Sequence, residues 1–229
     1  MADYNNSIIG KKLPKFEAQT TNGSITLPDD SLGNWVILYS YIGDFLPSDA
    51  SDILALDAAL AKFNAHDAKV YAMSPDSVAT HIAWNFALRN YKRDGKNIGI
   101  ELISDRALDI SKMLNTSTAD SDMNLNEKTV FIIDKDGVVR SRHNYSHSTG
   151  INVTDIEREL LALQTAQHQN AQTPVNWTPG EDVLEHPPKT IDSAGNNIQF
   201  KEAQGGRCID WYICYRADNG KRTEKQITP

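Results

Sequence analysis

The feature that most constrains the fold is a short apolar run that leads directly into the start of a helix. Residues 35–41 read Trp-Val-Ile-Leu-Tyr-Ser-Tyr, and a run of this length and composition predicts a buried strand. Gly43 and Pro47 then interrupt it. The Ser and Asp residues within positions 48–52 predict a helix start, because short oxygen-bearing side chains satisfy its free N–H groups. A strand that turns tightly into a helix N-terminus is a potential anion site.

The chain up to residue 165 continues with alternating strand and helix patterns. Asn22-Gly23 separates two short alternating segments, which predicts a hairpin over residues 15–27. Further strand patterns occupy residues 68–74, 98–105, 129–134 and 138–145, and helix patterns occupy residues 53–63, 77–84, 106–114 and 153–163. Asp76 is the expected cap of the second helix, and the polar run 115–128 predicts a long surface loop. This order predicts an α/β sandwich with a mixed central sheet.

Composition narrows the class of protein. The chain has 229 residues, 40% of them apolar, which is enough for one good core and a smaller appendage. Its 30 acidic against 23 basic residues argue against a nucleic-acid or membrane partner. No apolar run reaches spanning length and residues 1–6 lack signal-peptide features, so we expect a soluble cytoplasmic protein. No metal-ligand spacing, P-loop or dinucleotide fingerprint is visible, so no cofactor and no metal are expected.

The strand–loop–helix stretch resembles the active-site loop of the peroxiredoxins, the AhpC/TSA family, in which P-x-D-F-T-x-x-C-x-x-E leads into a helix. Gly43-Asp44-Phe45 and Pro47 match this loop. Residues 77–84 also resemble the S-x-x-x-H-x-A-W helix of the family, in which His81 and Trp84 are expected to have packing and structural roles. The resemblance implies a thioredoxin-like α/β sandwich with a small C-terminal domain.

The residues that carry the family's chemistry are replaced. Ile42 stands where the family has proline, Leu46 where it has threonine, and Asp49 where it has the peroxide-reducing cysteine. The G-R-N triplet, whose arginine activates that cysteine, corresponds to Gly150-Ile151-Asn152. A carboxylate cannot form a sulfenic acid. Most of the replacements are apolar, which predicts a pocket for a larger apolar guest.

The C-terminal part resembles the long, one-cysteine subclass of the family. The glutamine-rich connection 164–172 predicts a boundary between a peroxiredoxin domain, 1–165, and a C-terminal dimerisation domain, 173–229. Cys208 and Cys214 resemble the paired-cysteine tail of archaeal members, and whether they form a disulfide is open. Without a peroxide-reacting partner we expect them to be vestigial or structural. The resemblance implies a homodimer or a ring of dimers.

Asp49 has three possible roles. It could cap the helix, with Asp52 completing a capping box, or it could imitate the charge of a cysteine sulfinate. It could also be a general acid or base, buried with no cation beside it and with a raised pKa.

Weaker candidates surround Asp49 in the predicted site. His147 is a weak candidate to share a proton with it. The residues expected to bind a substrate are Tyr41, Ile42, Leu46, Tyr145 and Ile151.

Three functions are compatible with these residues, and whether the chain is an enzyme stays open. The favoured hypothesis is a protein that is not a thiol peroxidase, but a cofactor-independent enzyme that uses Asp49 on a small organic substrate. The alternatives are an inactive, pseudo-peroxidase paralogue with a structural or partner-binding role, and an engineered peroxiredoxin scaffold.

Overall fold

The computed structural model of the protein describes residues 7–116 and 127–218. The chain divides into two compact units, Met1–Val153 and Thr154–Pro229.

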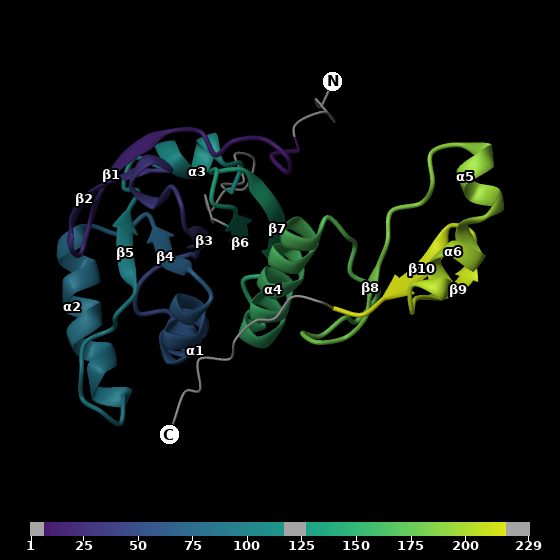
Figure 1. Cartoon of the computed structure of the whole chain (residues 1–229). Helices are drawn as coiled ribbons and strands as arrows, with labels where there is room; N and C mark the ends of the chain where they lie inside the picture. The colour runs from purple at the N-terminus through teal and green to yellow at the C-terminus, as the bar shows by residue number, and fades with distance from the viewer. Residues whose placement is uncertain (1–6, 117–126, 219–229) are drawn as a thin grey trace. The chain divides into compact units, whose positions relative to one another are not determined.

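The first unit is built on a seven-stranded mixed sheet with the order β2-β1-β5-β4-β3-β6-β7 (Figure 1). The three central strands β5, β4 and β3 are parallel, and the flanking strands pair with them antiparallel. The strands are β1 Phe16–Thr20, β2 Gly23–Leu27, β3 Trp35–Ser40, β4 Ala68–Ser74, β5 Glu101–Ser104, β6 Lys128–Ile133 and β7 Val139–Tyr145. Every residue of β3 and of β6 is buried, as expected for interior strands of a covered sheet.

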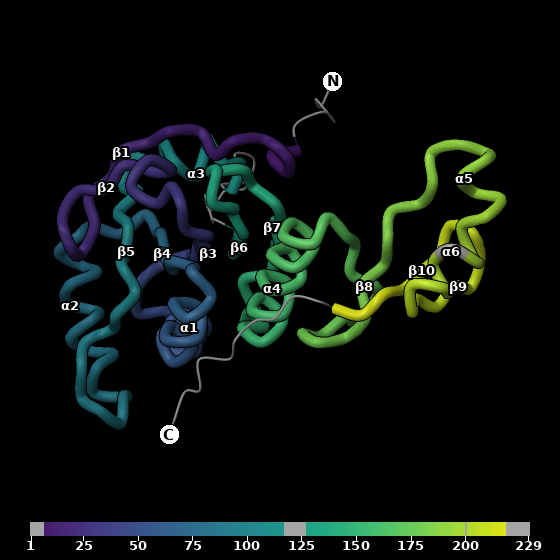
Figure 2. The backbone as a smooth tube through the Cα atoms, viewed as in Figure 1, coloured from purple at the N-terminus to yellow at the C-terminus, as the bar shows by residue number. Residues whose placement is uncertain are grey.

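Helices connect the parallel strands. The helices are α1 Pro47–Ala65, α2 Val78–Leu88 and α3 Asp109–Met113, with short 3₁₀ turns η1 Asp29–Ser31 and η2 Arg89–Tyr91. α1 packs against β4 and α2 against β5. Because both crossovers advance in the same direction, right-handed connections place α1 and α2 on one face of the sheet. Figure 2 traces this path from β3 through α1, β4 and α2 into β5.

The main core of this unit draws on both edges and the centre of the sheet. It joins the N-terminal hairpin to the central strands, and its largest members include Phe16, Leu38, Tyr71 and Phe131. The thioredoxin-like α/β fold predicted from the sequence is confirmed by these elements and by the solved structures described below.

Two local predictions are wrong. Ser77, not Asp76, caps α2, since its side chain accepts from the N–H of Thr80. The polar pattern predicts that Lys128 ends a surface loop, whereas it begins β6 and is buried. Most of that predicted loop, residues 117–126, lies outside the described residues.

The second unit contains one long helix and a small sheet. α4 (Val153–Gln169) starts at the unit boundary, and three antiparallel strands follow in the order β8-β10-β9. These strands are Val183–Leu184, Ile213–Arg216 and Arg207–Asp210, and two short helices precede β9, α5 Ile191–Gly195 and α6 Asn197–Ala203. The core of this unit gathers around Trp177, with Leu161, Ala162, Ala171 and Val183. The glutamine-rich segment predicted as a connection is largely helical, because α4 continues to Gln169.

No helix in the described parts of the chain is both long and apolar enough to cross a membrane.

Candidate functional site

The loop between β3 and α1 is held by carboxylates. The N–H of Gly43 donates to Asp49 Oδ2 at 3.1 Å, and the N–H of Asp44 donates to Asp76 Oδ2 at 2.7 Å. Phe45 has φ of 62°, in the left-handed region that side chains other than glycine rarely adopt. Leu46 is then extended and Pro47 begins the helix. The surrounding hydrogen bonds therefore hold the loop in a sparsely populated conformation.

Asp49 lies in the first turn of α1 and is fully buried. Besides the bond from Gly43, its Oδ1 lies 3.1 Å from Lys128 Nζ. That contact is an ion pair without hydrogen-bond geometry, since Oδ1 accepts no hydrogen bond among the described residues. Neither Ser51 nor Asp52 donates to Asp49 there, and Leu46 is the N-cap. The predictions of a capping residue and a capping box are therefore wrong.

Lys128 is the centre of the buried network. Its ammonium group donates to Ser48 Oγ at 2.5 Å, to Asp52 Oδ2 at 2.7 Å and to the carbonyl of Thr149 at 3.2 Å. The side chain has no exposed surface. Three donated bonds satisfy the ammonium group, and the expectation that no cation lies beside Asp49 is wrong.

Asp52 of α1 is hydrogen-bonded to three other segments of the chain. Its Oδ2 also accepts from the hydroxyl of Tyr39 at 2.7 Å, and its Oδ1 accepts from the N–H of Ile151 at 3.1 Å. Gly150 permits this approach, because a Cβ there would lie 3.0 Å from Asp52 Oδ1. β3, α1, β6 and the loop before α4 thus meet at one carboxylate.

The pKa of Asp49 is raised above its ordinary value. Burial is the main cause, and the Asp52 carboxylate adds to it; the Gly43 N–H and the Lys128 ammonium act in the opposite direction. The raised pKa expected for Asp49 is thus present. The cause is desolvation, which raises the pKa by more than the neighbouring Lys128 ammonium group lowers it.

A second buried network lies beside this one. His81 Nδ1 lies 2.8 Å from Asp44 Oδ2, and Nε2 lies 3.2 Å from the carbonyl of Ile103. The hydroxyl of Tyr41 donates to Asp44 Oδ1 at 2.7 Å, and burial raises the pKa of Tyr41 well above its ordinary value. The ring of Trp84 lies 5.7 Å from that of Tyr41. His81 and Trp84 therefore have structural roles, as the sequence predicts.

The structure brings together only part of the predicted site. Ile42 and Ile151 are half-buried, while the side chain of Leu46 is 41% exposed. The hydroxyl of Tyr41 is already bonded to Asp44. His147 is exposed, and no described hydrogen bond or ion pair joins it to Asp49.

Tyr145 is the one predicted site residue that is placed by strand register. It is half-buried on β7, paired with Lys128 of β6. Binding roles for these side chains stay predictions.

Sequence reasoning missed Lys128, although it forms the network's only described cationic contacts with Asp49 and Asp52. The available signal was its position two residues before the apolar run Val130–Ile133, close enough to belong to the same buried strand. Among the described residues, no group of three or more His, Cys, Asp or Glu side chains could hold a metal ion.

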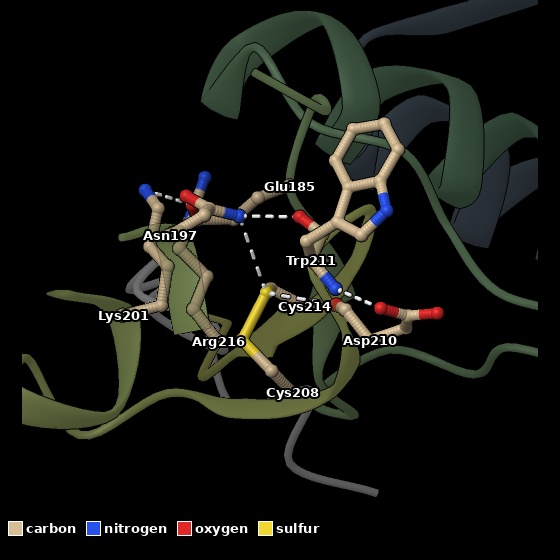
Figure 3. The surroundings of a disulfide bond; sticks show 8 residues. All are labelled: Glu185, Asn197, Lys201, Cys208, Asp210, Trp211, Cys214 and Arg216. Atoms are coloured by element: carbon tan, nitrogen blue, oxygen red, sulfur yellow. Dashed lines mark hydrogen bonds and ion pairs between the residues drawn. A yellow bond between two sulfur atoms is a disulfide. The ribbon is translucent and has the colours of Figure 1, made fainter. Parts of the chain in front are cut away.

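The thiol chemistry of the chain lies in the second unit. Cys208 and Cys214, the two cysteines of the sequence, form a disulfide between paired positions of β9 and β10 (Figure 3). Cys214 is 2% exposed, and Cys208 is half-buried. Asn197, at the start of α6, donates from Nδ2 to the carbonyl of Trp211 at 2.6 Å and to Cys214 Sγ at 3.5 Å.

A thioredoxin-like sheet with a strand–loop–helix site is the arrangement found in the peroxiredoxin class. The AhpC/TSA family model matches residues 9–142, and the C-terminal domain of 1-Cys peroxiredoxin matches residues 162–199. The chain therefore belongs to the AhpC/TSA, or peroxiredoxin, family.

Individual relatives agree with this membership. A peroxiredoxin of Methanosarcina mazei is 35% identical over 93% of this chain and 99% of its own length. One of Aquifex aeolicus is 31% identical over 90% and 95%. A solved yeast mitochondrial 1-Cys peroxiredoxin has a TM-score of 0.80 at 24% identity, over 91% of this chain and 98% of the other, and supports the fold. A Plasmodium vivax 2-Cys peroxiredoxin has a TM-score of 0.69 at 29% identity, over 78% and 93%.

These findings correct the predicted function. The sequence favoured a cofactor-independent acid/base enzyme, with an inactive pseudo-peroxidase or an engineered scaffold as alternatives. Relatives named peroxiredoxin along nearly the whole chain, peroxiredoxin structural neighbours and the Cys208–Cys214 pair overturn that interpretation. The pair is consistent with a peroxidase-type tail, in place of the vestigial role predicted for it.

Proposed function

We propose that this protein reduces peroxides through the Cys208–Cys214 pair. The observation that carries the proposal is that these two cysteines, the chain's only thiols when reduced, are joined as a disulfide. Peroxide reduction in this class of chemistry needs a thiolate as nucleophile. Position 49, at the start of α1, has a carboxylate in that place.

The proposed reaction balances with two thiols. A thiolate of the pair attacks one oxygen of the hydroperoxide, the O–O bond breaks, and the leaving alkoxide or hydroxide takes a proton. The resulting sulfenic acid is attacked by the second thiol, which forms the disulfide and releases water. An external dithiol then returns two electrons by thiol–disulfide exchange. In a reducing compartment such as the cytoplasm, the pair would be held as the dithiol that meets the peroxide.

The test uses the full chain, reduced and freed of reductant, and one equivalent of hydrogen peroxide. We expect the loss of both thiols, the consumption of one peroxide per chain, and a Cys208–Cys214 disulfide by peptide mapping. The Cys208→Ser variant should not form it, and Cys214→Ser should stop at a sulfenic acid that a dimedone-type reagent traps. A reduced synthetic peptide of residues 207–216 is the matched control. Peroxide consumption no faster than that of the peptide would overturn the proposal.

Self-assembly belongs to the same proposal. Large apolar side chains of the second unit are exposed, among them Val175 at 88%, Ile191 at 91% and Ile209 at 64%. Exposed apolar surface of this kind supports a homodimer or a ring of dimers.

A further inference from the structure

The two sulfurs of the disulfide differ in accessibility. Cys214 is 2% exposed and lies in the middle of the small sheet, whereas Cys208 on β9 is half-buried. A thiolate that opens a disulfide must approach the attacked sulfur directly, and the other sulfur leaves. Solvent therefore reaches Cys208, and Cys214 is the sulfur that departs as a thiolate.

The side chain of Asn197 is fixed so that its amide NH₂ faces that leaving sulfur (Figure 3). Asn197 is 9% exposed, and its Nδ2 lies 2.6 Å from the carbonyl oxygen of Trp211. A carbonyl oxygen only accepts, so the group opposite it must be the NH₂ and not the amide oxygen. Its second hydrogen is available for Cys214 Sγ at 3.5 Å.

Charged groups on the elements around the disulfide have other partners. Lys201 of α6 and Arg216 of β10 both pair with Glu185, and the Arg207 guanidinium of β9 lies 4.3 Å from the Tyr215 ring centroid. Asp210 of β9 accepts from the N–H of Trp211. The carbonyl oxygen of Asp210 also lies 3.6 Å from Cys214 Sγ, but a carbonyl oxygen only accepts. The neutral amide of Asn197 is thus the donor that the described contacts place on the Cys214 sulfur.

We propose that Asn197 is a positioning residue that receives the Cys214 thiolate, so that the disulfide is opened by attack at Cys208. The step is RS⁻ plus the disulfide giving a mixed disulfide RS–S on Cys208 and a thiolate on Cys214, with no change in total charge or electrons. This inference rests on the proposed redox role of the pair and adds a direction to it. A hydrogen bond to the charged form of a thiol stabilises that form, and a more stable thiolate leaves faster.

A neighbouring residue supplies a matched control. A cavity of about 370 Å³ is lined by His186, Pro188, Asp192, Ser193, Asn196, Asn197 and Lys201. Asn196 shares this lining but is exposed, and its side chain makes no capping bond to α6. Asn196→Ala therefore removes an amide from the same cavity without removing the contact to sulfur.

The first experiment maps the direction of opening in the unaltered protein. The oxidised chain is treated briefly with limiting 2-mercaptoethanol, alkylated with iodoacetamide and digested. We expect the mercaptoethanol adduct on Cys208 and the alkyl group on Cys214. An adduct mainly on Cys214, or equally on both, would overturn the assignment.

The second experiment measures the donor directly. In Cys208→Ser, Cys214 is the sole thiol, and its thiolate is followed by ultraviolet absorbance. Adding Asn197→Ala should lower the thiolate fraction near neutral pH by roughly tenfold, and Asn197→Asp should lower it further by placing a like charge beside the sulfur. Asn196→Ala should leave it unchanged. Equal fractions in the Asn197→Asp and Asn196→Ala proteins would refute the role, even if Asn197→Ala did not fold.

Neither experiment contains peroxide, which separates the two proposals. If both exchange experiments give the expected results but the protein does not consume peroxide, the proposed function is wrong and the proposed direction of exchange still holds. A protein that consumes peroxide through the pair, with no effect of Asn197, would remove only the present inference.

Discussion

Replacing Lys128 by methionine tests whether the buried network of the first unit is held together by its cation. Methionine has a similar length and no charge, so Lys128→Met removes the ammonium group while keeping most of the buried volume. The change leaves Asp49 and Asp52 facing each other in the interior. It also removes the bonds to Ser48 Oγ and the Thr149 carbonyl.

The expected loss follows from the geometry. Asp52 Oδ2 lies 2.7 Å and Asp49 Oδ1 3.1 Å from the ammonium nitrogen, and the lysine side chain has no exposed surface. Removing one member of a buried ion pair leaves the other charge buried without a partner, which lowers the free energy of unfolding by about 3–5 kcal/mol. At about 2–4 °C per kcal/mol for a domain of this size, the melting temperature should fall by roughly 6–20 °C.

The assay is urea unfolding at neutral pH, followed by far-ultraviolet circular dichroism. Lys135→Met is the matched control, because Lys135 pairs with Asp67 at 3.2 Å while 45% of its side chain is exposed. An exposed pair of this kind contributes about 0–1 kcal/mol. The triple variant Asp49→Asn, Asp52→Asn, Lys128→Met should recover most of the loss, since neutral replacement of a whole buried charge cluster is often tolerated.

Two results would refute this reasoning. A loss below about 1 kcal/mol in Lys128→Met would mean that the cation does not hold the carboxylates in place. A triple variant as unstable as the single one would mean that packing, and not charge, explains the loss.

Three further predictions concern the same fold. Because burial raises the pKa of Asp49 above its ordinary 3.8, its native carboxylate form is disfavoured, so its contribution to the free energy of unfolding falls as pH rises from about 3.8 through the native pKa. Urea titrations at successive pH values should show the free energy of unfolding of Asp49→Asn rising relative to that of the parent as pH increases through this window. A relative fall would contradict the assignment. Gly150→Ala should cost about 1–3 kcal/mol in the same assay, because its Cβ would meet Asp52 Oδ1 at 3.0 Å, and an unchanged midpoint would count against it. Sedimentation at micromolar concentration should give a dimer or larger, and a monomer would contradict the proposed assembly.

Most of the sheet could be predicted from the sequence because each strand has a recognisable pattern of apolar and turn residues within a few positions. The Asn22-Gly23 turn and the apolar runs of β3 and β4 are readable within a few residues, and the structure has strands in all three places. The ends of the helices were less predictable. The helix pattern ending near residue 163 continues to Gln169 as α4, since polar glutamines are also good helix formers.

The candidate site was predictable in position but not in its contacts. The place of Asp49 at the start of a helix after a buried strand was readable, but its burial was not, and its partner Lys128 is 79 positions further along the chain. Only the pairing of β3 with β6 brings the two together. The polar neighbours of Lys128 in the sequence therefore predict a loop at this position.

For the cysteine pair the sequence left the pairing open. The expected vestigial or structural role rested on what position 49 lacks, and the structure adds that the two cysteines form a disulfide. Local spacing could not distinguish a disulfide from two free thiols; the register of β9 and β10 does so.

The closeness of the two cysteines makes the redox state of this protein a local property. Only six positions separate them, so the cross-link closes a small ring and restricts the unfolded chain by only about 2 kcal/mol in loop entropy. The first unit contains no cysteine and keeps the same covalent structure in either state. A protease that cuts near residues 205–212 should therefore distinguish oxidised from reduced protein, while cleavage within the large sheet should proceed at one rate in both.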